Sequence, residues 1–176
     1  VPYPGREGHE DYFNALNRSK KSVALDLKSK VDQATALRLL ERADVLVENF
    51  APGTAARLGL GWHVAHAANP RLVYCSLSGF GQTGPYAHRP AMDPIIQAMT
   101  GIMSINGEAD GGPLRVGLPV VDMVTGLNAV IGVLLALNER QRSGRGQFVE
   151  AALYDSGLSL LHPHAANWFM DGTEPK

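Results

Sequence analysis

Short apolar runs alternate with amphipathic stretches through the first half of the chain. Apolar side chains recur every third residue from Val31 to Leu40, a spacing that predicts a helix over residues 31–42. Shorter helices are expected over 53–58 and 62–68. Compact apolar runs predict strands at 22–27, 44–48, 71–77 and 147–153. Strands that alternate with helices indicate an α/β fold, a parallel sheet with helices on its faces.

One long apolar segment dominates the second half. Residues 125–142 are apolar around most of a helix, which predicts a helix buried on most sides. Their longest apolar run, 130–137, is too short to span a bilayer. We also expect a helix over 93–103, extended chain over 114–121 and a helix over 154–170.

Composition narrows the classes of protein. The 176 residues carry a net charge of −1, so neither nucleic acid nor an acidic membrane is an expected partner. The single cysteine excludes an intrachain disulfide framework and a cysteine-rich metal site. It fits a reducing compartment, and no basic-then-apolar export signal is visible, so we expect a cytoplasmic location.

A glycine-rich segment at 79–84 follows the predicted strand 71–77 and spells G-x-G-x-x-G. A dinucleotide site needs a helix directly after such a turn, but Pro85 and the residues that follow it make a poor helix. We therefore favour a loop that flanks a substrate. The paired histidines lack a convincing third ligand, so surface or packing roles are expected and no metal site is predicted: His63, His66, His162 and His164.

Asp122 follows an apolar stretch and opens the most hydrophobic helix of the chain. One interpretation is a helix cap, since aspartate is favoured at that position. The other is a carboxylate positioned at a helix N-terminus to attack a carbonyl group. Spacing alone leaves both interpretations open.

Six segments, in order, together resemble the class III coenzyme A transferases, the carnitine and formyl-CoA transferase type. The segments lie at 17–28, 45–53 with 57–59, 78–85, 89–93, 121–126 and 140–147. The resemblance implies a Rossmann-like domain over 22–155, after an irregular lead-in over 1–21. Residues 156–176 would be a helical segment that leads to a further small domain, and the chain would form an interlocked homodimer.

The resemblance also implies the site. Asp122 corresponds to the catalytic aspartate of the family. Lys28, Arg57 and Arg89 would serve the phosphates of CoA, where positive charge is required. The full set of implied CoA contacts is Leu25, Asp26, Leu27, Lys28, Asn49, Phe50, Ala51, Arg57, Arg89, Pro90, Ala91, Met92 and Asp93.

The implied reaction moves CoA from an acyl-CoA to a small carboxylic acid, through an aspartyl anhydride and an aspartyl-CoA thioester. CoA is then a substrate, and no metal or redox cofactor is needed. Two alternatives stay open: an acyl-CoA racemase of the same fold, and a non-catalytic CoA-binding module. The racemase branch carries a histidine where this chain has Met92.

Family members have a strand–helix unit before the matching region and a covering loop after it. We therefore expect residues 1–176 alone not to turn over, because an acyl-enzyme open to water would hydrolyse.

Overall fold

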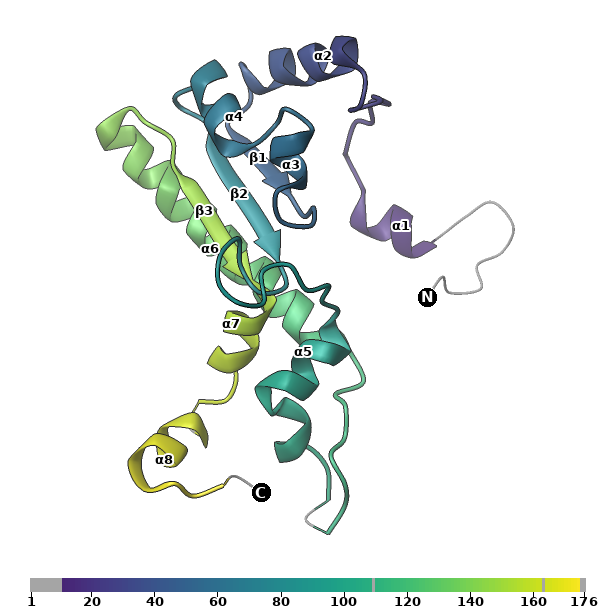
Figure 1. Ribbon diagram of the computed structural model, residues 1–176, viewed down its shortest axis with the longest axis vertical. Helices are drawn as coiled ribbons and strands as arrows, with labels where there is room; N and C mark the ends of the chain where they lie inside the picture. Colours follow the sequence, from purple (N-terminus) through teal and green to yellow (C-terminus); the bar gives the residue numbers. More distant parts are fainter. Residues whose placement is uncertain (1–10, 109, 163, 175–176) are drawn as a thin grey trace.

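The computed structural model describes residues 11–108, 110–162 and 164–174, and its centre is a parallel sheet (Figure 1). Within these residues the sheet has three strands in the order β1 (Val45–Glu48), β2 (Val73–Ser78) and β3 (Phe148–Ala152). Val45 pairs with Val73, and Tyr74 pairs with Phe148. The central strand β2 is the most buried of the three, which makes it the core of the fold.

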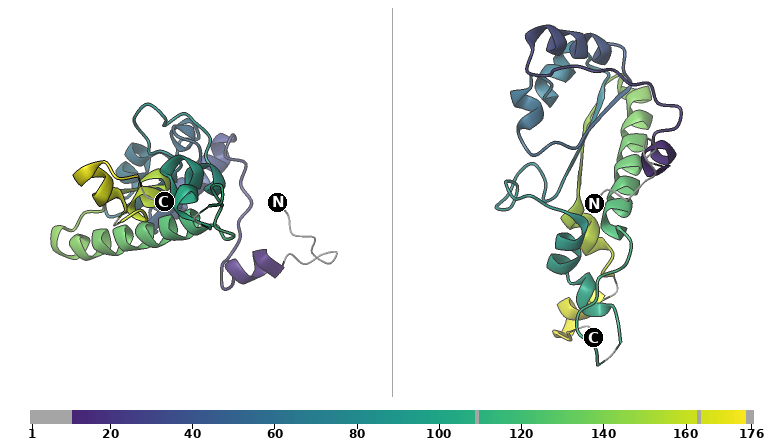
Figure 2. Two further views of the ribbon diagram at one scale, coloured as in Figure 1. Left: turned by 90° about the horizontal axis from the view of Figure 1, so that it is seen from below. Right: turned by 90° about the vertical axis from the view of Figure 1, so that its right-hand side faces the viewer.

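Helices cover both faces of this sheet, as Figure 2 shows. On one face, α2 (Lys30–Leu40) and α4 (Trp62–Ala68) pack around Tyr74. On the other face, α6 (Val120–Ser143) packs against β2 and β3. Side chains alternate along a strand, so Tyr74 faces the first layer and Cys75 faces Ala129 of α6. The predicted α/β architecture, a parallel sheet with helices on both faces, is confirmed.

A third apolar cluster lies beyond the carboxyl ends of the strands. Its buried members are Ile96, Ile102 and Val121, which come from α5 (Asp93–Thr100), the 3₁₀ turn η1 (Ile102–Ile105) and α6. The helix α7 (Leu153–Ser159) follows β3 directly and packs against α5 and α6. The remaining helices are α1 (Asp11–Leu16), α3 (Thr54–Arg57) and α8 (His164–Asp171).

The strand expected at residues 22–27 is wrong. This segment is irregular, and its backbone is bound by side chains of α2: the Asp26 N–H donates to Asp32 (2.8 Å), and Gln33 donates to the Leu27 carbonyl (2.8 Å). A strand needs a neighbouring strand to bind its backbone. In the described residues, β1 is paired with β2 alone. Leu25 and Leu27 instead pack against the cluster around α2.

The long helix α6 differs from its prediction in two ways. It begins at Val120 rather than 125, and it is not buried on most sides. A helix on a sheet buries only the stripe that faces the sheet, and here that stripe contains the small residues Ala129 and Ala136. Apolar side chains on its outer surface are about 55–67% exposed: Leu127, Val130, Ile131, Leu134 and Leu135.

The full helix is also longer than the apolar run at 130–137 indicated. It has 24 residues, and by length and composition alone it is apolar enough to cross a membrane. Core helices of soluble proteins pass the same test, but those are mostly buried, whereas α6 packs on the sheet along one side only.

The two other segments of this half also differ from expectation. Residues 114–119 are irregular rather than extended, and 154–170 form two helices, α7 and α8, instead of one. Pro163, within the expected helix, lies outside the described residues.

Candidate functional site

A hollow of about 310 Å³ opens at the carboxyl ends of β1 and β2. Parallel strands all end at the same edge of a sheet, which is where ligands of open α/β folds bind. Its walls come from the residues after β1, the end of β2 and the chain that leads into α5. The lining residues are Asn49, Phe50, Ala51, Pro52, Ser78, Gly79, His88, Arg89, Pro90 and Ala91.

The hollow depends on a close approach between two of its walls. A side chain at Gly79 would place its Cβ 2.2 Å from the Cβ of Ala91, which no real structure tolerates. Glycine at this position therefore lets the segment before α5 lie directly against the end of β2.

The structure brings together six of the CoA contacts that the resemblance implies. Asn49, Phe50 and Ala51 form one wall, and Arg89, Pro90 and Ala91 form another. Arg57 lies close by on α3, where its guanidinium donates to the Thr54 hydroxyl (2.6 Å). The guanidinium of Arg89 is stacked 4.2 Å from the centre of the Tyr86 ring, which gives this exposed cation a fixed place at the rim.

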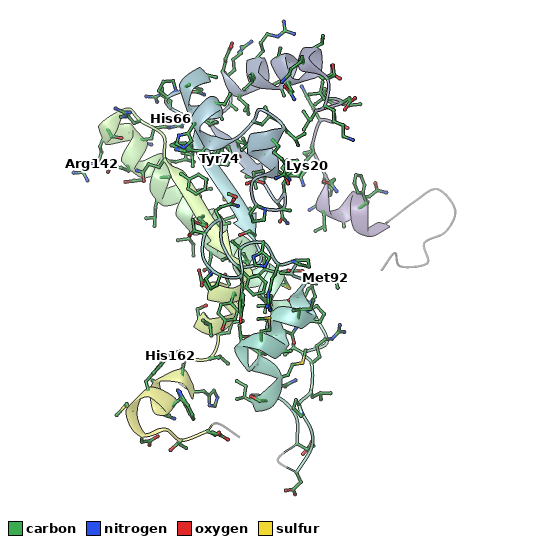
Figure 3. The ribbon with its side chains drawn as sticks, viewed as in Figure 1. Lys20, His66, Tyr74, Met92, Arg142 and His162 are labelled. Carbon is green, nitrogen blue, oxygen red and sulfur yellow. The ribbon has the colours of Figure 1, made fainter. Side chains whose placement is uncertain are left out.

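The first four implied contacts do not line the hollow. Leu25 and Leu27 belong to the packing around α2, and the Asp26 carboxylate accepts from the Lys28 N–H (3.0 Å). Lys28 is exposed in the segment that leads into α2. Met92 is exposed at the start of α5, where Figure 3 labels it at the junction of sheet and helix.

Asp93 is buried beneath the first turn of α6. One carboxylate oxygen accepts hydrogen bonds from the backbone N–H groups of Val121 (2.8 Å) and Asp122 (3.1 Å). The implied CoA contact at Asp93 is therefore occupied by protein groups. Asp122 itself is exposed in that first turn. Partial burial and then the charge of Asp93 raise the pKa of the Asp122 carboxyl.

A polar clasp fastens the glycine-rich loop to the sheet, and sequence reasoning missed it. Glu48, Ser76 and Glu150 are paired across the three strands, and the Ser76 hydroxyl donates to Glu48. Gln82 joins them: its amide donates to Ser76 (2.9 Å), and its backbone N–H donates to Glu150. The register of the strands creates this clasp, and no spacing along the chain shows that register.

The conformation of the glycine-rich loop at 79–84 fits a loop that flanks a substrate better than a dinucleotide-binding turn. Gly81 and Gly84 have φ of +89° and +97°, a left-handed conformation that suits glycine. Turns follow it, and the next helix, α5, begins only at Asp93. The helix N-terminus that a dinucleotide phosphate needs is therefore not formed at this loop.

Two of the other candidates have packing roles, whereas His63 and His162 are exposed. His66 lies against the Trp62 ring, with 4.4 Å between ring centres, and Cys75 is a buried thiol in the middle of β2. Across the described ranges, no three histidine, cysteine or acidic side chains are grouped closely enough to hold a metal ion.

Comparison with known proteins identifies the family. Residues 1–176 match CoA-transferase family III. The chain is 43% identical over 175 residues to an acetyl-CoA:oxalate CoA-transferase of Acetobacter aceti, covering 99% of this chain and 44% of that protein. It is 42% identical over 164 residues to a succinate–glutarate CoA-transferase of Agrobacterium fabrum, covering 93% of this chain and 41% of that protein.

A solved structure gives the same result. A CaiB/BaiF family protein of Brucella suis superimposes with a TM-score of 0.90 at 42% identity, over 94% of this chain and 44% of that one. The chain thus spans less than half the length of these relatives. Sequence and fold agree, and the chain belongs to CoA-transferase family III.

Proposed function

We propose that the protein is an acyl-CoA:carboxylate CoA-transferase in which Asp122 is the nucleophile. The observation that carries the proposal is an exposed carboxylate with a raised pKa in the first turn of α6. The segment that lines the hollow, Arg89–Ala91, is joined through Met92 to Asp93, which accepts from the N–H of Asp122. The same reaction is supported by the two relatives named above, an acetyl-CoA:oxalate CoA-transferase and a succinate–glutarate CoA-transferase.

A carboxylate suits this exchange because its acyl derivatives stay reactive toward a thiolate. Asp122 attacks the thioester carbonyl, the C–S bond breaks, and an aspartyl anhydride and CoA thiolate form. The thiolate then attacks the aspartyl carbonyl, which gives an aspartyl-CoA thioester and releases the first acid. The acceptor carboxylate then attacks the aspartyl-CoA thioester, which releases CoA thiolate and forms a second anhydride. The thiolate attacks the acceptor's carbonyl in that anhydride, which gives the new acyl-CoA and regenerates Asp122.

The hollow is proposed to bind CoA, with cations at its edge for the phosphates. Arg89 lines it and Arg57 lies on the neighbouring helix α3. Guanidinium groups bind phosphate through paired, charge-assisted hydrogen bonds. The exposed ring of Phe50 gives the same wall an apolar surface for the nucleotide base.

The tetrahedral intermediates need hydrogen-bond donors, and several nearby backbone groups are already bound. Asp93 accepts from the N–H groups of Val121 and Asp122. Those of Gly81 and Gln82 donate to Ser78 and Glu150. These four N–H groups are therefore not available as donors to the oxyanion.

The racemase alternative needs two opposed acid–base groups at the α-carbon. Asp122 would be one, but the thioether of Met92 carries no proton to exchange. We therefore propose the transferase, and transfer assays in deuterated water check it: deuterium gained at the α-carbon of a 2-methylacyl-CoA would favour the racemase.

The test is Asp122→Asn in the longest polypeptide that carries this sequence. Transfer from acyl-CoA to a small dicarboxylate should fall by about 10⁴-fold or more, as for other lost nucleophiles. CoA binding should stay close to wild type. Asp155→Asn is the matched control, because Asp155 is an exposed carboxylate on α7, which also packs against α6. Near-normal turnover by a folded Asp122→Asn variant would refute the proposal.

A further inference from the structure

The N-terminus of α6 is capped by a side chain from another helix. Its own N-cap residue is Pro119, which makes no side-chain cap bond. The first N–H groups of a helix need an acceptor when they are shielded from water. Asp93, the first residue of α5, supplies it to Val121 and Asp122 across 28 and 29 residues of sequence.

Gln97 completes the arrangement one turn further along α5. Its side chain is fully buried, and its amide nitrogen donates to the other oxygen of Asp93. Its amide oxygen accepts from the Val116 N–H (2.9 Å) in the segment before α6. The pair therefore holds both the first turn of α6 and the chain that leads into it.

We propose that Asp93 is a positioning residue for Asp122. By accepting hydrogen bonds from the first turn of α6, it fixes the direction of the Asp122 carboxylate and holds a negative charge close to it. These hydrogen bonds are independent of any reaction, while their effect on transfer rests on the proposed function. Asp93 is 5% exposed, and its acceptor oxygens face protein donors, so its side chain is not offered to CoA.

The electrostatic part of the role comes from two like charges held close together. Burial, and then the negative charge of Asp93, raise the pKa of Asp122. Carboxylates on other elements packed against α6 are Glu150 of β3 and Asp155 of α7, and neither is a cause of that shift. A more basic carboxylate is the better nucleophile once it is ionised.

Two variants separate the hydrogen bonds from the charge. In Asp93→Asn, the new amide NH₂ group faces the Gln97 amide NH₂ group, so two donors oppose each other. When Asp93→Asn is combined with Gln97→Glu, the carboxylate introduced at position 97 accepts from the new amide at position 93 and from the Val116 N–H. The double variant restores these bonds, loses the longer bond from position 97 to the Leu118 carbonyl (3.4 Å), and moves the negative charge from position 93 to position 97.

The primary readout is the pKa of Asp122, measured by carbon-13 NMR on protein labelled at the aspartate carboxyl, with Asp122→Asn to assign the signal. We expect this pKa to fall in the double variant and to stay unchanged in the control Asp155→Asn. An unchanged pKa in a folded double variant would overturn the proposal. This titration needs no activity, so it holds or fails independently of the proposed reaction.

The second readout is kinetic. In Asp93→Asn we expect kcat to fall by about 100-fold, the size of loss that follows a small displacement of a reacting group. The double variant should recover part of that loss, with KM for acyl-CoA close to wild type in both. If KM rises and kcat stays constant, Asp93 is a CoA contact and the positioning role is wrong.

Discussion

At the scale of single residues, Asp122 is held in surroundings that oppose its charge. Partial burial and the charge of Asp93 both raise the pKa of Asp122, so the folded state favours the protonated form. A group with a raised pKa contributes stability that is complete below its unfolded pKa, near 3.9 for aspartate. That stability is lost as the pH rises through the folded pKa.

Asp122→Asn should therefore gain stability relative to wild type as the pH rises. The neutral amide escapes the penalty that the ionised carboxylate meets beside Asp93. Urea unfolding of both proteins at a series of pH values from 3 to 7 measures the difference in the free energy of unfolding. The difference should shift in favour of the variant up the series, and a shift in favour of wild type would mean that the fold stabilises the charge.

Some residue roles could be predicted from the sequence and others could not. The motif around Asp122 placed it at the start of a helix, where the structure has it. The partner Asp93 was expected to bind CoA, since a motif shows which residues occur together but not which atoms they meet. Its actual partners lie 28 and 29 residues away, across the packing of two helices.

At the scale of elements, Arg140 fastens the end of α6 to the start of the sheet. Its guanidinium donates to the backbone carbonyls of Asp44 (3.3 Å) and Arg71 (3.0 Å) and forms an ion pair with the Asp44 carboxylate (2.9 Å). The carboxylate is largely exposed, so the carbonyl bonds carry most of the effect.

Arg140→Gln should lower the free energy of unfolding by about 1.5–3 kcal/mol, the range for hydrogen bonds to charged groups. Arg142→Gln is the control, because that arginine is exposed on the same turn and points away from the sheet (Figure 3). The control should change stability by less than about 0.5 kcal/mol. Equal losses in urea unfolding of the two variants would show that the carbonyl bonds contribute nothing.

Elements whose two ends are marked by neighbouring residues in the sequence were predicted well. The helix at 62–68 has the expected bounds, since Pro70 follows it closely and glycine precedes it. The segment 22–27 failed because a strand depends on its neighbours, and alternating apolar residues can equally pack as irregular chain. The burial of α6 failed because apolar composition does not show how many sides of a helix meet other protein.

At the scale of the whole molecule, the outer surface of α6 is unusual because it exposes apolar side chains that a core helix would bury. Contiguous exposed apolar side chains mark surfaces that other protein covers. Leu127, Leu134 and Leu135 form part of such a surface. We propose a second copy of the polypeptide as the partner, in line with the homodimer that the resemblance implies.

The protein should therefore sediment as a dimer in analytical ultracentrifugation. Leu134→Lys should shift it toward the monomer, because a charge buried in an apolar contact is costly. Gln141→Lys, at an exposed position on the same helix, serves as the control and should remain dimeric. A wild-type protein that is monomeric at micromolar concentration would contradict the proposal.

The central claim is that Asp122 carries the transferred group, and the fate of its oxygen atoms tests it most directly. Transfer is run with an acceptor acid labelled with oxygen-18 in its carboxylate, and the peptide that contains Asp122 is then weighed by mass spectrometry. In a single turnover the proposed reaction leaves one labelled oxygen on Asp122, because the acceptor's oxygen stays behind when CoA thiolate attacks the acceptor's carbonyl in the anhydride. Repeated turnovers label both oxygens. Full transfer with no label on Asp122 would contradict the account.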